Sequence, residues 1–263
     1  MLNKIKSRSI FRLFLIPLLI ILMVQGIVVY AMIAANDIAG IIYNYSVTTM
    51  KRTIENRKTT FENQMTERWS VLRESDQSLK NRMKDFLEEK NISIEDVKND
   101  NQLQVEYLQM VFSICLSQVD NSNCSGFFMC MTGNDYTGSI SANGFYVRDS
   151  EPYHVAEDNS DLLFVRGNKN ISRSSNIALD ADWTTNIELS GEGNDDFEKF
   201  IYEPWRAGRE NTEADVADLG YWSEPFRLGG EVRSGYDVIT YSIPLRYKDE
   251  VYAILGIEIS EDI

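Results

Sequence analysis

The chain has 263 residues, enough for one or two domains, and 43% of them are hydrophobic, as in an ordinary globular protein. With 26 basic and 40 acidic residues its formal net charge is −14, so its surface should repel nucleic acid and anionic lipid. Nucleic acid is therefore excluded as an expected partner.

The first predicted element is an uncharged apolar segment, residues 13–35. As a helix with a rise of ~1.5 Å per residue, it is long enough to cross a hydrocarbon core of ~30 Å. Four basic residues precede it and Asp37 is the first charge after it, which places residues 1–12 in the cytoplasm and the rest outside. The alternative is a cleaved signal peptide, whose apolar region usually covers only roughly 7–15 residues. We therefore predict an uncleaved anchor that crosses the cell membrane once.

Residues 36–90 are predicted to form one long extracellular helix. They contain no Pro and a single Gly, and their apolar residues recur at helical spacing. This stripe consists of Met50, Ile54, Phe61, Met65, Trp69, Leu72, Leu79, Met83 and Phe86. A helix of about 50 residues would be ~75 Å long, which exceeds a compact domain of this size. We therefore expect part of the stripe to form a homodimer, and packing against the chain's own domain is the alternative.

Residues 91–263 change from helical to strand-like patterns. Ser93 and Asp96 form a predicted N-cap for a short helix that runs through residues 103–116. Short β-branched and aromatic runs bounded by Gly, Asn and Asp predict strands at 126–133, 144–149 and 161–167. An amphipathic helix that begins at residue 196 should end at Pro204. Three final strands are predicted at 220–226, 236–245 and 250–260, so the fold class is α+β.

The last two of these strands form a predicted hairpin, connected by residues 248–250. Alternation along the final strand should place five apolar side chains on one face. These are Val251, Ala253, Leu255, Ile257 and Ile259. In the preceding strand segment, Pro225 cannot donate a ladder hydrogen bond, so pairing should be interrupted there.

Residues that could support metal or catalytic chemistry are scarce. The three cysteines (115, 124 and 130) are too few for a disulfide framework. Cys124 and Cys130 could form a disulfide only if the chain turns between them, since alternation along one strand would put both on the same face; buried free thiols are the alternative. His154 is the only histidine, and there is neither zinc-ligand spacing nor a nucleophile elbow. We expect no catalytic residue, metal or cofactor, and therefore no enzyme.

Three stretches near the end of the chain resemble a known family. They read YWSEPF (221–226), ITYSIPL (239–245) and VYAILGIEIS (251–260). Together with the anchor and the long helix, they resemble the extracellular Cache sensor domains of bacterial receptors. The resemblance is greatest to the membrane-distal module of a double-Cache domain of the Firmicutes type.

This resemblance implies a PAS-like fold, in which a long helix packs on an antiparallel sheet and a small-molecule ligand lies over that sheet. Residues 91–263 would form this Cache-like module, and the helix carrying Pro204 and Trp205 would help to cover the ligand. The family's outputs are histidine kinases, diguanylate cyclases and chemoreceptors. None of their cytoplasmic signatures is present, so we expect an input half that stops before a membrane-proximal module.

The amino-acid-binding branch of the family has a motif from which this chain departs. Trp205 matches the family's Trp, but Glu203 stands where an Arg would bind the ligand carboxylate, and Arg206 stands where a Tyr is usual. At the next element Phe226 replaces Tyr and Leu228 replaces Asp. Without the Arg, an α-amino-acid ligand is disfavoured. We therefore favour an amine, a polyol or another small metabolite.

The resemblance and the residue types together give a predicted ligand site, for which core packing of the aromatics is the alternative. Aromatic rings would supply apolar area, and a carboxylate would accept a ligand hydrogen bond. The predicted site residues are Trp205, Trp222, Phe226, Tyr236, Asp237 and Glu258. The competing function is that of an anchored structural or interaction ectodomain without a small-molecule ligand.

Overall fold

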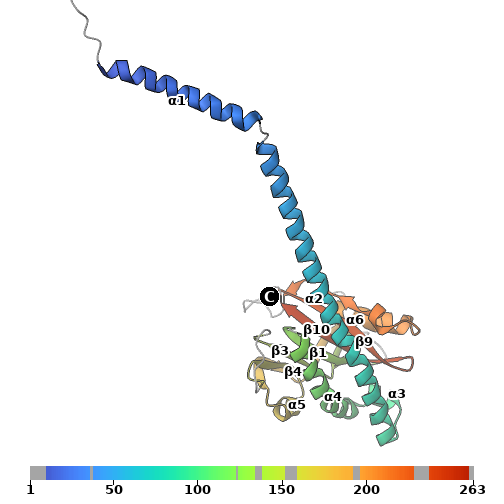
Figure 1. The fold of residues 1–263 in the computed structure, drawn as a ribbon. Coiled ribbons are helices and arrows are strands. Elements are labelled where there is room, and N and C mark those ends of the chain that lie inside the picture. Colours follow the sequence, from blue (N-terminus) through green and yellow to red (C-terminus); the bar gives the residue numbers. More distant parts are fainter. Residues whose placement is uncertain are drawn as a thin grey trace, which may run out of the picture. The chain divides into compact units, whose positions relative to one another are not determined.

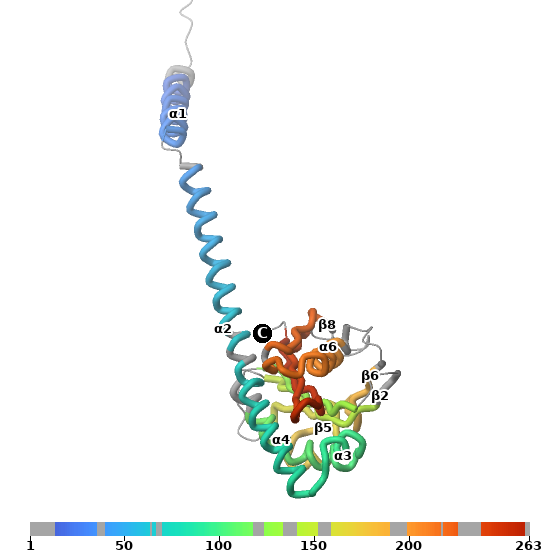
Figure 2. The backbone as a smooth tube through the Cα atoms, turned by 90° about the vertical axis from the view of Figure 1, so that its right-hand side faces the viewer, coloured from blue at the N-terminus to red at the C-terminus, as the bar shows by residue number. Residues whose placement is uncertain are grey.

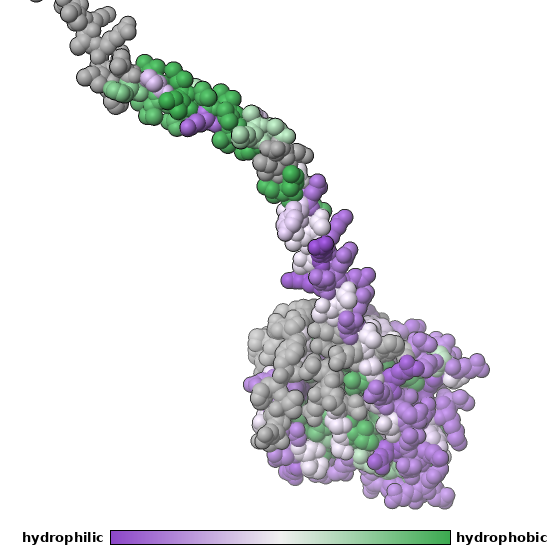
Figure 3. All heavy atoms as spheres, in the orientation of Figure 1, coloured by the Kyte–Doolittle hydropathy of each residue, from purple (hydrophilic) through white to green (hydrophobic). Residues whose placement is uncertain are grey.

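The computed structural model describes residues 10–35, 38–122, 124–133, 138–151, 159–191, 196–227 and 237–260. The chain divides into two units, Met1–Asn63 and Gln64–Ile263. The N-terminal unit contains α1 (Ile10–Ala35) and the first part of α2 (Ile38–Lys90). Among the described residues, Phe14–Ala35 of α1 is the one stretch long and apolar enough to cross a membrane, with a mean hydropathy of 2.6. Figure 3 shows the corresponding apolar surface of α1.

The long helix predicted over residues 36–90 extends from Ile38 to Lys90, and its apolar stripe has two different environments. In the C-terminal unit, four stripe residues are buried in the domain core: Leu72, Leu79, Met83 and Phe86. In the N-terminal unit, Met50, Ile54 and Phe61 are more than half exposed. Met65 is half-buried, and the side chain of Trp69 is outside the described residues. Packing against the chain's own domain therefore accounts for the stripe from Leu72 onward.

Side-chain caps define the turns between the first helices of the C-terminal unit. Asn91 adopts a positive φ of 53°, as is common directly after a helix, and the Ile92 N–H donates to the Leu87 carbonyl at 3.1 Å. Ser93 and Asp96 form the predicted N-cap, as a capping box, but the helix that it begins is α3 (Ile94–Asn99), which ends before the predicted residues 103–116. Asp100 accepts from the backbone at the start of α4 (Asn101–Ser122), a longer helix than predicted.

The core of the unit is a large sheet with the strand order β5-β4-β3-β1-β10-β9-β7, and β8 also pairs with β9 (Figure 1). All pairs are antiparallel except β4–β5. The strands are β1 (Gly126–Met131), β3 (Gly144–Asp149), β4 (Leu162–Gly167), β5 (Ala178–Thr184), β7 (Tyr221–Trp222), β8 (Phe226–Arg227), β9 (Asp237–Tyr247) and β10 (Glu250–Ser260). The predicted α+β class is confirmed.

The remaining elements cover parts of this sheet. β2 (Gly138–Ala142) and β6 (Ile187–Gly191) form a separate two-stranded sheet. The helices are α5 (Lys169–Ser174), α6 (Asp196–Glu210) and the 3-10 turn η1 (Val216–Leu219). Figure 2 shows α4 and α6 on opposite sides of the large sheet. The two faces of the sheet therefore have separate apolar clusters, one with α2 and α4 and one with α6.

Alternation along the central strands assigns side chains to these faces, with one irregularity. In β10, Ala253, Leu255 and Ile257 belong to the cluster with α2 and α4, as predicted. Val251 belongs to the α6 cluster instead, so its predicted placement is wrong. A register shift between Val251 and Ala253 interrupts the alternation there, since an extra residue in one strand reverses the side-chain directions.

The three cysteines are free and buried, which confirms the simpler of the two interpretations. Burial raises the pKa of Cys115 and of Cys130 to about 12. Cys124 lies in the cluster with α2 and α4, whereas Cys130 lies in the α6 cluster. The two are therefore on opposite faces, contrary to the same-face prediction, because Cys124 precedes β1 and does not follow its alternation.

Two prolines have opposite outcomes. Pairing with β9 is interrupted between β7 and β8, as Pro225 predicts, and the Ser223 hydroxyl accepts the Thr240 N–H at 2.9 Å within that gap. Pro204, by contrast, does not end its helix, since α6 continues to Glu210. Pro204 lacks the N–H that would bond the Phe200 carbonyl, and the Ser242 hydroxyl donates to that carbonyl instead. This tertiary hydrogen bond removes one cost of a proline inside the helix.

Candidate functional site

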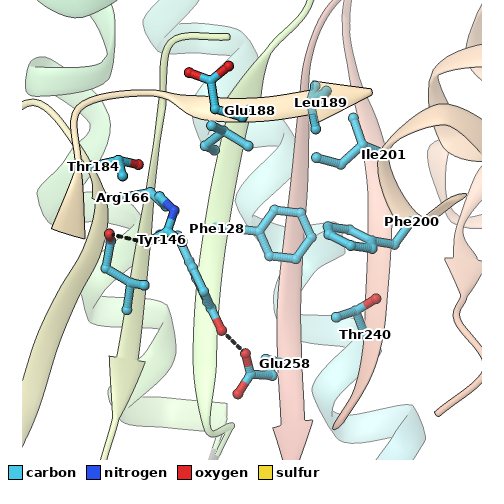
Figure 4. A pocket seen from close by; sticks show the side chains of 12 residues that line it. Phe128, Tyr146, Arg166, Thr184, Glu188, Leu189, Phe200, Ile201, Thr240 and Glu258 are labelled. Atoms are coloured by element: carbon cyan, nitrogen blue, oxygen red, sulfur yellow. Dashed lines mark hydrogen bonds between the residues drawn. The ribbon is translucent and has the colours of Figure 1, made fainter. Parts of the chain in front are cut away.

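A cavity of about 200 Å³ lies on the face of the large sheet that α6 and β6 cover (Figure 4). Eight elements contribute to its wall. The lining residues are Phe128, Tyr146, Val165, Arg166, Thr184, Ile187, Glu188, Leu189, Phe200, Ile201, Thr240 and Glu258. The wall combines aromatic and aliphatic side chains with a few polar groups, which is the usual composition of a small-molecule site.

Aromatic side chains form the centre of the cavity wall. The rings of Phe128 and Phe200 meet edge to face with their centroids 5.1 Å apart, and they face each other in Figure 4. Phe128 also lies on the backbone of Gly256, where an added Cβ would overlap its ring. A glycine in β10 is thus needed for Phe128 to lie flat on the sheet. Ile201 and Leu189 extend this apolar surface.

Glu258 is the most buried charged residue of the wall, with 1% of its surface exposed. Its Oε1 accepts from Arg148 Nε and Nη2, both at 3.2 Å, and from the Ser125 hydroxyl at 3.3 Å. Its Oε2 accepts from the Tyr146 hydroxyl. Burial raises the pKa of the Glu258 carboxyl, and the positive charge of Arg148 opposes that shift. The carboxylate is therefore balanced by a neighbouring cation before any ligand arrives.

Tyr146 contributes the donor that completes this arrangement. Its pKa is raised well above the usual value by burial and by the negative charge of Glu258. The residue as a whole is only half-buried, but its hydroxyl points at Glu258, away from solvent. The phenol therefore stays protonated and acts as a hydrogen-bond donor to Glu258.

Thr240 lies beside Glu258, at the position directly opposite on the neighbouring strand β9. It is 2% exposed, and its hydroxyl has no hydrogen-bond partner in the part of the chain that the structure describes. Its backbone, in contrast, is fully paired with Ser223, which accepts from its N–H and donates to its carbonyl, each at 2.9 Å. Thr240 thus brings an unsatisfied polar group to the cavity wall.

A second group of polar residues lies at the opposite end of the cavity in Figure 4, where Thr184 and Glu188 are labelled. Arg166 Nη1 donates to the carbonyls of Val165 and Asp182, both at 2.8 Å, which fixes its side chain along the sheet edge. Glu188 is exposed and accepts from the Ser141 hydroxyl at 2.9 Å. This end is therefore more open to solvent than the end with Thr240.

The structure places the six sequence-predicted site residues in different environments. Glu258 lines the cavity, whereas Trp205 is buried in the adjoining α6 cluster, where Arg209 stacks over its ring at 4.8 Å. Trp222 stacks on Tyr241 with ring centroids 4.6 Å apart, and Tyr241 belongs to the cluster on the other face. Side chains of Phe226 and Asp237, and all of Tyr236, are outside the described residues.

Several lining residues were absent from the sequence-predicted site. Phe128 and Tyr146 lie in β1 and β3, strands that were predicted without a site role. Their alternation could have suggested that one face of each strand points away from the predicted helices at residues 36–90 and 103–116. The pairing of Glu258 with Arg148 had no local signal, since the two residues are 110 positions apart.

The structure holds no obvious metal centre in its described part, where no three His, Cys, Asp or Glu side chains converge. A scan of protein-family models found no match, and no curated protein matches the chain. Matches to solved structures are remote in sequence and geometry. The extracellular domain of a protein assigned as a histidine kinase, soHK1S-Z6, is 14% identical with a TM-score of 0.29, covering 78% of this chain and 62% of that one.

Two further solved structures give similar figures. The periplasmic sensory domain of the Campylobacter jejuni chemoreceptor Tlp1 is 12% identical with a TM-score of 0.34, and the match covers 76% of this chain and 58% of that one. A methyl-accepting chemotaxis protein X is 10% identical with a TM-score of 0.30, and the match covers 78% of this chain and 63% of that one. The chain spans about three fifths of the structures it matches. Matches this weak assign neither a family nor a ligand to the chain.

Proposed function

We propose that the chain is the extracellular input domain of a membrane-anchored bacterial signal-transduction receptor, which binds a small molecule over its sheet and signals through α2. The observation that carries the proposal is the cavity under α6. Its apolar wall and its few convergent polar groups suit a small organic ligand. No catalytic step is assigned to the chain.

The proposed location follows from α1 and its flanks. Phe14–Ala35 has the length and composition of a membrane span, and the basic residues before it favour a cytoplasmic N-terminus. An uncleaved anchor then leaves the C-terminal unit outside the cell. N-terminal sequencing of the protein from the membrane fraction tests this: a mature chain that begins near Asn36 would contradict the anchor.

A signal from the cavity has a short path to α2 through the sheet. In β10, Glu258 lines the cavity and Gly256 lies under the ring of Phe128, while the neighbouring Leu255 and Ile257 face the cluster that contains Leu72 of α2. A ligand that shifts β10 by a small distance would therefore act on side chains that contact α2. Packed cores respond to such shifts by changing between discrete arrangements.

A second path runs through the segment that follows α6. Arg246 donates to the carbonyls of Asn211, Thr212 and Ala214, which holds this segment against β9. The next residue, Asp215, forms an ion pair with Arg73 of α2 at 3.5 Å. A movement of α6 on ligand binding would therefore change a contact with α2 as well.

The competing proposal is an anchored interaction ectodomain that takes no small molecule. The two are separated by a thermal-shift screen of the detergent-solubilised full chain against a metabolite library, because a ligand that binds only the folded state raises Tm as its concentration rises. A cavity-filling Ile187→Trp substitution should abolish any such shift, whereas Leu179→Trp, at an exposed position outside the cavity, should not. If no compound stabilises the protein, the interaction ectodomain is favoured.

A further inference from the structure

We propose that the cavity selects a small, mainly apolar ligand whose single polar head is uncharged (a hydroxyl, carbonyl or amide) and binds the Thr240 hydroxyl beside Glu258. This inference rests on the proposed sensor function and narrows its ligand class. It replaces the amine or polyol that the sequence favours. Three features of the cavity lead to it.

The first feature is the unsatisfied hydroxyl of Thr240. A buried hydroxyl without a partner costs free energy, because it has lost water without gaining a protein hydrogen bond. Ser223 already satisfies both backbone groups of Thr240, so only the side-chain oxygen is left. Thr240 is one of the residues that line the cavity. A ligand group that donates to it or accepts from it would remove the cost.

The second feature is the charge balance at the same end of the cavity. Glu258 is paired with Arg148 and also accepts from Tyr146 and Ser125. A ligand ammonium would therefore meet a carboxylate that is already compensated. A ligand carboxylate would lie beside Glu258 and be repelled by it. An uncharged head avoids both penalties, and burying it costs less than burying a charge.

Arg166 is the one cation among the described lining residues, and it is far from Thr240. Arg166 belongs to β4, which is four strands away from β9 in the sheet order. At a spacing of roughly 4.8 Å between neighbouring strands, their backbones are ~19 Å apart. Arg166 Nη1 is moreover occupied by two carbonyl oxygens. Arg166 therefore does not compensate a negative head at Thr240.

The third feature is the apolar wall between these two ends. Phe128, Phe200 and Ile201 surround the centre of the cavity (Figure 4). A polyol would bring several hydroxyls against these side chains, and each would lose its water without a protein partner. A ring or branched aliphatic body instead buries apolar surface there. The wall thus favours one polar head on an apolar body.

Three probes with the same ring test the charge selection: cyclohexanol, cyclohexylamine and cyclohexanecarboxylate. Binding to the detergent-solubilised full chain is measured at pH 7 by saturation-transfer NMR titration. We expect cyclohexanol to bind at least about tenfold more tightly than either charged probe. Tighter binding of the amine or of the carboxylate would overturn the proposal, and a charged hit from the metabolite screen would do the same while leaving the sensor function intact.

Two substitutions test the role of Thr240. Thr240→Val keeps the shape of the side chain but removes the hydroxyl, so it should weaken cyclohexanol binding about tenfold while the unliganded protein becomes more stable. Thr240→Ser retains the hydroxyl and should bind like the parent. If Thr240→Val binds as tightly as the parent, or if Thr240→Ser loses binding to the same extent as Thr240→Val, the assignment is wrong. If no probe and no library compound binds, this proposal and the sensor function both fail.

Discussion

Asp76 on α2 is a half-buried residue whose carboxylate charge is only partly compensated. Burial raises the pKa of its carboxyl above the usual value of about 3.9, Lys80 and Arg246 oppose the shift, and Asp215 adds to it. Its Oδ1 has no hydrogen-bond partner among the described residues. Ionised Asp76 therefore costs stability in the folded state, and this cost develops as pH rises from the unfolded pKa of ~3.9 to the raised folded pKa, above which it is constant.

Replacing Asp76 by Asn should remove this pH-dependent cost. Well below pH ~3.9 Asp76 is neutral in both the folded and the unfolded state, as Asn is, so the parent and Asp76→Asn should have similar Tm values. As pH rises from ~4 to 7, the variant should become progressively more stable relative to the parent. Thermal denaturation at several pH values measures the difference, with Asp218→Asn at an exposed position as the control. A Tm difference that is independent of pH would show that the charge of Asp76 does not matter.

Leu255 is a second residue whose role can be measured, because its side chain lies between β10 and α2. It is 3% exposed and lines a small void that Leu72 and Ser75 of α2 also line. Leu255→Ala should enlarge that void and lower the free energy of unfolding by about 2–5 kcal/mol, the usual range for a buried Leu. Chemical denaturation measures the loss. A loss under ~1 kcal/mol would mean that Leu255 does not face the core.

At the scale of elements, α6 depends on a hydrogen bond from another strand. Removing the Ser242 hydroxyl would leave the Phe200 carbonyl without the donor that replaces the missing N–H of Pro204. Ser242→Ala should therefore lower the free energy of unfolding by about 1–3 kcal/mol. In a Pro204→Ala background the helix supplies its own N–H, so the same Ser242→Ala change should cost less. Chemical denaturation of the parent, the two single variants and the double variant measures this coupling. Equal losses in the free energy of unfolding in both backgrounds would contradict it.

The elements that the sequence predicts well are those with local signals. The capping box at Ser93, the interruption at Pro225 and the closing hairpin each depend on residues close together in the chain. The elements that it misses depend on distant partners. Pro204 is tolerated because of Ser242, and Val251 changes face because of a shift in strand pairing. Neither is visible from propensity or alternation.

The candidate site shows the same limit. Glu258 could be predicted because the closing strand is distinctive, but its charge balance depends on Arg148 and Tyr146 of β3. Without those partners the carboxylate suggests an amine ligand, and with them it does not. The unsatisfied hydroxyl of Thr240 is likewise a property of the folded chain, since it depends on which groups pack around β9. Ligand chemistry was therefore the least predictable part.

At the scale of the whole molecule, the large sheet has a different role on each face. One face carries the cavity and α6, and the other carries the core that holds the second part of α2. Each strand sends alternate side chains to the two faces. A shift of a strand on the cavity face therefore also moves its side chains on the other face. This arrangement supports the proposal that ligand binding is passed to α2 through the sheet.

The first part of α2 is the surface to which a second copy of the chain would bind. Its exposed apolar residues, Met50, Ile54 and Phe61, are separated by four and seven residues, and the spacing of seven is that of a two-helix seam. Apolar surface of this kind at helical spacing is usually buried by a partner. We therefore propose a homodimer through this part of α2.

Cysteine cross-linking of the full chain in membranes tests the seam. Ile54→Cys should form a disulfide-linked dimer under mild oxidation, because a disulfide needs Cβ atoms within roughly 4.5 Å of each other. Glu55→Cys is the matched control, since Glu55 is the next residue, is also exposed, and points away from the stripe. The native cysteines are buried and should not contribute. A severalfold higher dimer yield at residue 54 than at residue 55, repeated at Phe61 against Glu62, supports the seam, whereas equal yields at both positions of each pair would mean that α2 has no defined partner surface.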